Sequence, residues 1–224
     1  MNLMTAERTD VRRGRFSWLF RCSAVLHAAA ALLVLFVLAR ATEGSWLKRS
    51  LYLVSHENLV ILSWVSSLLS VLAVVGTFAV LVSTLNRDFR LILQWAWLIG
   101  LIGAAALILN HLAHILLFPP LVRMLVDVPR PDLVVHMEQW EQLLSPVVQV
   151  FAPTCFAVCG LIFTGAMFRT RGISVLHAWW SLGVWAILLL GALSVWWSAE
   201  AVAWFQGFAV FMYIPWLWSM GERV

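Results

Sequence analysis

Six long apolar stretches, with the charged residues gathered between them, constrain this chain more than any other feature of its sequence. A helix needs about 20 residues to cross the hydrocarbon core of a bilayer, and each stretch reaches that length. Lipid gives backbone groups no hydrogen-bond partners, so each crossing segment must be helical. The chain is 62% hydrophobic and 12% charged, whereas a soluble domain is about half apolar and a quarter charged. The sequence therefore predicts an all-α polytopic membrane protein, a bundle of six transmembrane helices.

The expected organisation is a basic tail over residues 1–15 and a transmembrane domain over residues 16–220. Six spans are predicted, at about residues 16–39, 58–86, 91–118, 143–168, 175–197 and 201–220. Two connections, residues 40–55 and 119–142, are long and are expected to be outer loops. The connections between spans 2 and 3, 4 and 5, and 5 and 6 are tight, which predicts antiparallel neighbours. An Ala-x-Ala pattern at residues 39–41 leaves signal-peptide cleavage as an alternative, although the first apolar run is longer than a signal peptide needs.

The distribution of Lys and Arg predicts that both termini are cytoplasmic. Of the 15 basic residues, ten fall on the side of the N-terminus and five on the side of the two long connections. This is the direction that the positive-inside rule requires. The same bias explains the net charge of +4, so the lipid bilayer is the expected partner and nucleic acid is not.

The third span is expected to turn one face toward the interior of the bundle. Six of its residues recur at steps of three and four, which places them on one side of a helix: Ala96, Gly100, Gly103, Leu107, His111 and His114. Small residues let a second helix approach closely in a membrane. The two histidines continue this small-residue face.

The second span carries a seam of polar residues with a period of seven. The members of this seam are His56, Ser63, Ser70, Thr77 and Thr84. A heptad of small and hydroxylated residues is typical of a packed helix–helix contact. If this seam faces the third span, His56 comes within reach of His111 and His114.

Four of the six histidines are expected at the outer membrane level, with two acids near the start of the fourth span. Imidazole nitrogens and neighbouring carboxylates form the ligand set of zinc, copper, iron and haem. The candidate ligands of a divalent metal or haem b are therefore His56, His111, His114, His136, Glu138 and Glu141. The alternative is that these histidines form hydrogen bonds across helices, lie in the head-group layer or are solvated in loops.

The sequence carries no motif of a known catalytic class. It has no His-Glu-x-x-His, no Cys-x-x-Cys, no glycine-rich phosphate loop and no serine nucleophile motif. An enzymatic role is therefore not indicated, and three functions stay open. The foremost is a structural, accessory or sensory membrane subunit that associates with other subunits or with itself. The alternatives are a redox or binding module with a metal or haem site, and a transporter or permease component that uses the hydroxyl seam.

The run Gly160–Gly172, with the sequence GLIFTGAMFRTRG, precedes a tryptophan-rich fifth span. It resembles the end of the fourth span in uncharacterised bacterial six-helix inner-membrane proteins. The likeness covers a small part of the chain and rests on small residues and a basic turn. It implies a multi-pass protein of a bacterial inner membrane and identifies no functional residue.

Overall fold

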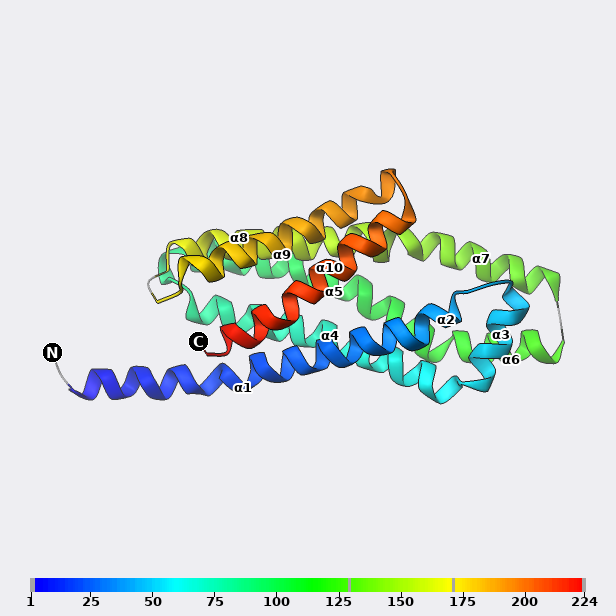
Figure 1. The fold of residues 1–224 in the computed structure, drawn as a ribbon, viewed down its shortest axis with the longest axis horizontal. Coiled ribbons are helices and arrows are strands. Elements are labelled where there is room, and N and C mark those ends of the chain that lie inside the picture. Colours follow the sequence, from blue (N-terminus) through cyan, green and yellow to red (C-terminus); the bar gives the residue numbers. More distant parts are fainter. Residues whose placement is uncertain (1–2, 129, 171, 223–224) are drawn as a thin grey trace.

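A computed structural model describes residues 3–128, 130–170 and 172–222 of the chain (Figure 1). Within these ranges every regular element is a helix. The elements in chain order are α1 (Leu3–Leu33), the π-helical turn η1 (Val34–Leu38), α2 (Ala39–Ala41), α3 (Trp46–Ser55), α4 (Glu57–Thr84), η2 (Arg87–Phe89), α5 (Arg90–Leu116), α6 (Phe118–Asp127), α7 (Pro131–Pro146), the π-helical turn η3 (Val147–Phe151), α8 (Ala152–Phe168), α9 (Val175–Leu193), η4 (Ser194–Trp196) and α10 (Ala199–Met220). The side chains of the predicted tail, residues 1–15, lie outside the described part.

Six helical stretches are long and apolar enough to cross a membrane. They are Phe16–Ala41, Glu57–Thr84, Arg87–Asp127, Pro131–Phe168, Val175–Trp196 and Ala199–Met220. The prediction of an all-α protein with six spans is thereby confirmed, while the side of the membrane that each end faces stays a prediction. The third and fourth stretches contain 41 and 38 residues. Both are therefore longer than the roughly 20 residues that one crossing needs.

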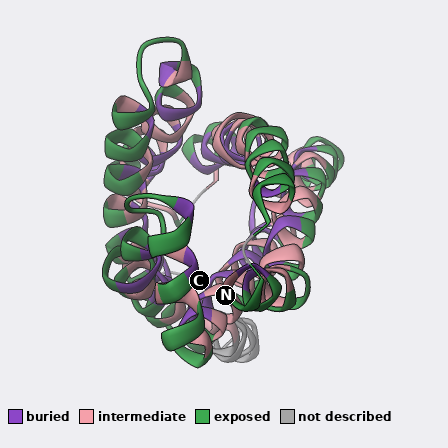
Figure 2. Cartoon of the chain, turned by 90° about the vertical axis from the view of Figure 1, so that its right-hand side faces the viewer, coloured by how far each residue is buried: buried purple, intermediate pink, exposed green. Residues whose placement is uncertain are grey.

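The six spans form a ring in which each helix packs most extensively against two neighbours, while aromatic side chains such as Phe78 of α4 and Trp185 of α9 meet across its centre. The order around the ring is α1, α4, α5, α8, α9, α10 and back to α1. Figure 2, seen along the bundle, shows the buried faces turned inward and the exposed faces turned outward. The neighbours α4–α5, α8–α9 and α9–α10 confirm the pairs that the tight connections predict.

Glycines allow the helices of this ring to approach closely. A Cβ added at Gly103 on α5 would lie 2.7 Å from the Cβ of Cys155 on α8. A Cβ added at Gly160 on α8 would lie 2.1 Å from Cδ2 of Trp185 on α9. The face predicted on the third span is buried or half-buried throughout, at Ala96, Gly100, Gly103, Leu107, His111 and His114. The sequence pattern therefore identifies the inward face of α5 correctly.

The two connections predicted as long loops are largely helical. Residues 40–55 contain α3, and residues 119–142 contain most of α6 and α7. Proline occupies the first turn of both α6 and α7, where a missing N–H costs no helical hydrogen bond. Arg130 is the N-cap residue of α7, and Asp132 lies within the first turn. Figure 1 shows α3, α6 and α7 gathered at one end of the bundle, and we call these three helices the helical cap.

Candidate functional site at the cap end of the bundle

The helical cap has an apolar core of its own. This core consists of Trp46 from α3, Val122 and Leu125 from α6, and Met137 from α7. Each of the four side chains is at most 9% exposed. None of these short helices is able to bury such a face alone, so the three helices depend on one another for their position.

Arg49 of α3 connects α3 to α7 within the cap, and also connects the cap to the end of the first span. Its Nη1 donates a hydrogen bond of 3.2 Å to Glu141 of α7, and its Nη2 donates to the other carboxylate oxygen. Its Nε donates to the carbonyl of Ala41, at 3.1 Å. The guanidinium also lies 4.1 Å from the ring centroid of Trp46. A guanidinium suits this position because its planar fork matches a carboxylate and its face stacks on an indole.

A second ion pair links the cap to the second span. The Nε of Arg123 on α6 donates to Glu57 at the start of α4, at 2.9 Å, and Nη2 donates to the second carboxylate oxygen. The side chain of Arg123 is 59% exposed, whereas that of Arg49 is 14% exposed. Water screens the Arg123–Glu57 pair, so this pair contributes little to stability.

Two of the predicted ligands, His111 and His114, lie at this end of the bundle around Trp64 of α4. The ring of His114 stacks on Trp64, with centroids 4.0 Å apart, and on Phe118, at 4.2 Å. The ring of His111 meets the same indole edge-on, at 5.5 Å. Nδ1 of His111 donates a hydrogen bond to the carbonyl of Leu107, which leaves Nε2 as an acceptor. The two imidazoles therefore share an aromatic cluster that joins α4, α5 and α6.

The other four predicted ligands lie elsewhere at this end of the molecule: His56, His136, Glu138 and Glu141. The first three are exposed, and the Glu141 carboxylate is bound to Arg49. Across residues 3–128, 130–170 and 172–222, no group of three or more His, Cys, Asp or Glu side chains is placed to hold a metal ion. The structure thus brings His111 and His114 together on one indole, and metal or haem binding stays a prediction.

The hydroxyl groups on the predicted seam of the second span bond to their own helix. Ser63 donates to the carbonyl of Leu59, and Thr77 to the carbonyl of Ala73, both at 2.7 Å. Ser70 and Thr84 also donate to carbonyls within α4. These hydrogen bonds satisfy the hydroxyl donors within their own helix. They give no support to the hypothesis that this seam conducts a solute.

Four residues that organise this site belong to no motif or periodic pattern of the sequence: Arg49, Trp64, Phe118 and Arg123. For the two arginines, the sequence offers one hint, namely that acidic residues occur in segments far away along the chain. Arg49 and Glu141 are separated by 92 positions, and Glu57 and Arg123 by 66. Spacing along one helix gives no information about such pairs, because the folding of the connections into helices is what brings them together.

The chain matches no protein-family model, no curated protein and no solved structure. Its own geometry therefore has to support any functional inference. That geometry places three features at the cap end, namely the core of the cap, two Arg–Glu ion pairs and an aromatic cluster that contains two histidines.

Proposed function

We propose that this multi-pass membrane protein is an accessory or sensory subunit whose helical cap recognises another membrane subunit or a second copy of the chain. The excess of arginines at the opposite end supports a cap that faces outward and termini that face the cytoplasm. The resemblance of residues 160–172 supports a bacterial inner membrane. The observation that carries the proposal is an exposed apolar face on α7.

The length of the fourth stretch supports a position of α7 outside the hydrocarbon core. η3 and α8 contain 5 and 17 residues, which correspond to a length of about 33 Å. That length already covers the hydrocarbon core of about 30 Å. The 16 residues of α7 then add about 24 Å on the cap side.

On this projecting helix, apolar side chains face outward. Val135 is 50% exposed, Trp140 59% and Leu143 67%. Exposed apolar side chains inside the bilayer meet lipid and need no explanation, but beyond it they meet water. A cluster of such residues outside the hydrocarbon core is typical of a protein interface, and tryptophan is among the commonest anchors of one.

The proposal predicts that α7 can be cross-linked to a protein in native membranes. A photoreactive residue is placed at Val135 or Leu143 in the full chain, and at Ile102 as a lipid-facing control that is 51% exposed. Both α7 positions are expected to give one adduct of the same mass, and Ile102 none. An adduct of twice the mass of the chain identifies a second copy as the partner. Absence of protein adducts from both α7 positions contradicts the proposal.

A second candidate function, a metal- or haem-binding module, is favoured by the orientation of His111. Metal-bound histidines usually donate one ring N–H to a carbonyl or carboxylate, which fixes the tautomer and presents the other nitrogen. Nδ1 of His111 makes such a bond to Leu107, and His114 lies on the same indole. Two imidazoles supply half of a four-coordinate site, so the remaining ligands have to come from water, another subunit or the cofactor itself.

This candidate predicts bound metal or haem in protein that is purified in mild detergent without chelators. Metal content by mass spectrometry and the visible spectrum, oxidised and reduced, are the measurements. The His111→Ala, His114→Ala double variant is expected to lose the metal or the haem band, while His136→Ala, on the exposed face of α7, retains it. Wild-type protein that is colourless and free of metal contradicts this candidate, as does full retention in the double variant.

A further inference from the structure

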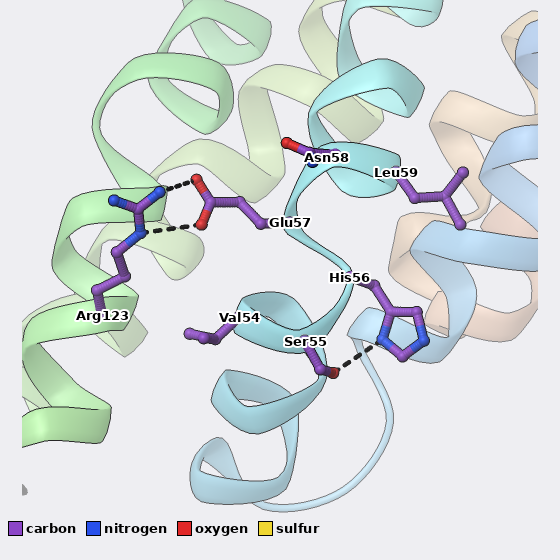
Figure 3. A pocket seen from close by; sticks show the side chains of 7 residues that line it. All are labelled: Val54, Ser55, His56, Glu57, Asn58, Leu59 and Arg123. Carbon is purple, nitrogen blue, oxygen red and sulfur yellow. Dashed lines mark hydrogen bonds and ion pairs between the residues drawn. The ribbon is translucent and has the colours of Figure 1, made fainter.

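A hollow of about 540 Å³ opens at the junction of the cap and the second span (Figure 3). Its lining residues are Val54, Ser55, His56, Glu57, Asn58, Leu59 and Arg123. The hollow exists because the chain breaks between α3 and α4 at His56, whose backbone angles of φ −122° and ψ 25° are not helical. The cap helix α6 lies across this break and contributes Arg123.

The polar groups of the hollow fall on two sides. Figure 3 shows Glu57 and Asn58 directed toward the Arg123 side, and His56 directed the other way. The His56 ring stacks on Tyr52, with centroids 4.5 Å apart. Its Nδ1 lies 2.8 Å from Oγ of Ser55. The side of the hollow that is open to a ligand is therefore the side of Arg123 and Asn58.

This side presents hydrogen-bond donors to the surroundings. Arg123 uses Nε and Nη2 for Glu57, so Nη1 is left over, and the side chain is 59% exposed. Within the described ranges, the exposed amide of Asn58 makes no hydrogen bond either. The Glu57 carboxylate, the acidic group in the lining, is paired with this guanidinium, so the two side chains together carry no net charge. The unused hydrogen-bonding capacity of Arg123 favours an anionic acceptor, and a guanidinium suits phosphate in particular.

The hollow lies at the level of lipid head groups. The 28 residues of α4 correspond to about 42 Å, which equals the full thickness of a bilayer with its head groups, about 40–45 Å. The first turn of α4 therefore ends in the head-group layer rather than in bulk water. One turn after Asn58 on α4, Leu62 is 54% exposed, whereas Leu59, 40% exposed, is directed toward the His56 side in Figure 3. Leu62 offers an apolar surface for an acyl chain on the side of Asn58.

We propose that the hollow binds the phosphodiester head group of a phospholipid, with Arg123 and Asn58 donating to the phosphate and an acyl chain lying along Leu62. The site is separate from the α7 face of the proposed function and does not depend on it. Bound lipid fills the gap between α6 and the start of α4. It thereby ties the cap to the leaflet on which the cap rests.

Two variants that break the same ion pair test this site with opposite expected results. Delipidated full-length protein is titrated with phosphatidylglycerol in detergent, and native mass spectrometry counts the bound lipids. Arg123→Gln is expected to weaken the tightest lipid by about tenfold, because one charge-assisted hydrogen bond is lost. Glu57→Gln frees the guanidinium and is expected to bind at least as tightly as the wild type. Lys48→Gln removes an exposed cap charge outside the hollow and is expected to change nothing.

Unequal behaviour of the two pair-breaking variants is the result that distinguishes a binding site from a structural ion pair. Equal losses in Arg123→Gln and Glu57→Gln, or no loss in either, overturn the proposal. Two further probes identify the source of the phosphate. Dioleoylglycerol, which lacks phosphate, is expected not to compete, and inorganic phosphate is expected to compete only weakly. Competition by inorganic phosphate as strong as that of the lipid contradicts a lipid site.

Discussion

Replacement of Gly160 with alanine is expected to destabilise the bundle by about 3 kcal/mol, the upper end of the range for overpacking a core. The added Cβ would lie 2.1 Å from Cδ2 and 2.3 Å from Cε2 of Trp185. The indole has no room to move, because Tyr213 and Phe78 pack against it with centroids 5.3 and 5.4 Å away. Its Nε1 also donates to Ser181 at 3.1 Å, so a displaced indole loses a buried hydrogen bond.

Gly165→Ala is the matched control for this prediction. It lies on the same helix, and nothing comes within 4 Å of its added Cβ, so it is expected to keep the free energy of unfolding or raise it by up to about 1 kcal/mol, through the higher helix propensity of alanine. Unfolding in mixed detergent, followed by circular dichroism, measures both variants. A smaller ring in Gly160→Ala, Trp185→Phe is expected to recover part of the loss. Equal stability of the two alanine variants shows that α8 and α9 do not meet at Gly160.

Replacement of Arg49 with glutamine is expected to loosen the helical cap while the spans stay folded. The change removes a bidentate ion pair to Glu141, a hydrogen bond to Ala41 and the stacking on Trp46. Loss of one partner from a fully buried pair costs about 3–5 kcal/mol. Glu141 is 34% exposed, so water compensates part of that cost, and about 2 kcal/mol is expected.

Hydrogen exchange of the backbone amides shows which helices this substitution destabilises. Faster exchange is expected in α3 and α7, and unchanged exchange in α8 and α9. Arg123→Gln breaks the more exposed ion pair and is expected to cost less stability than Arg49→Gln. In a double-mutant cycle, Arg49→Gln and Glu141→Gln are expected to be strongly non-additive, since the two side chains share one interaction. Additive effects contradict the coupling that the geometry indicates.

The transmembrane part of the fold follows from the sequence because one physical requirement dominates it. Lipid forces each apolar run of about 20 residues into a helix, whatever its detailed order. The inward face of α5 follows as well, since small residues at helical spacing, such as Gly100 and Gly103, permit close packing. A Cβ at Gly100 would indeed lie 3.0 Å from Sγ of Cys159.

The helical cap could not be predicted in the same way, because its segments are short and polar enough to be taken for loops. α3 and α6 contain 10 residues each, a length at which an isolated helix is marginal in water. Their stability comes from a core shared with α7, which depends on contacts between distant segments. The prolines at residues 119, 120 and 131 suggest breaks in a helix but stand in first turns, where they are tolerated.

The expected meeting of three histidines is only partly supported, and the reason is local. The seam on the second span predicts that His56 lies on the same face as Ser63. The helix begins at Glu57, however, so His56 does not share the helical phase of α4. Trp64 of α4 takes the place beside His111 and His114 that the prediction gave to His56. A seven-residue period therefore predicts which residues share a face only within one continuous helix.

Photocross-linking from α7 in native membranes, compared between the wild type and Arg49→Gln, tests the central claim that the helical cap is a recognition element. A discrete protein adduct is expected from Val135 in the wild type and a much weaker one in Arg49→Gln, because α7 loses the contact between its Glu141 and Arg49 of α3. Ile102 within the spans is expected to give no protein adduct in either background. Adducts of equal yield with and without Arg49, or none from α7 at all, contradict the claim.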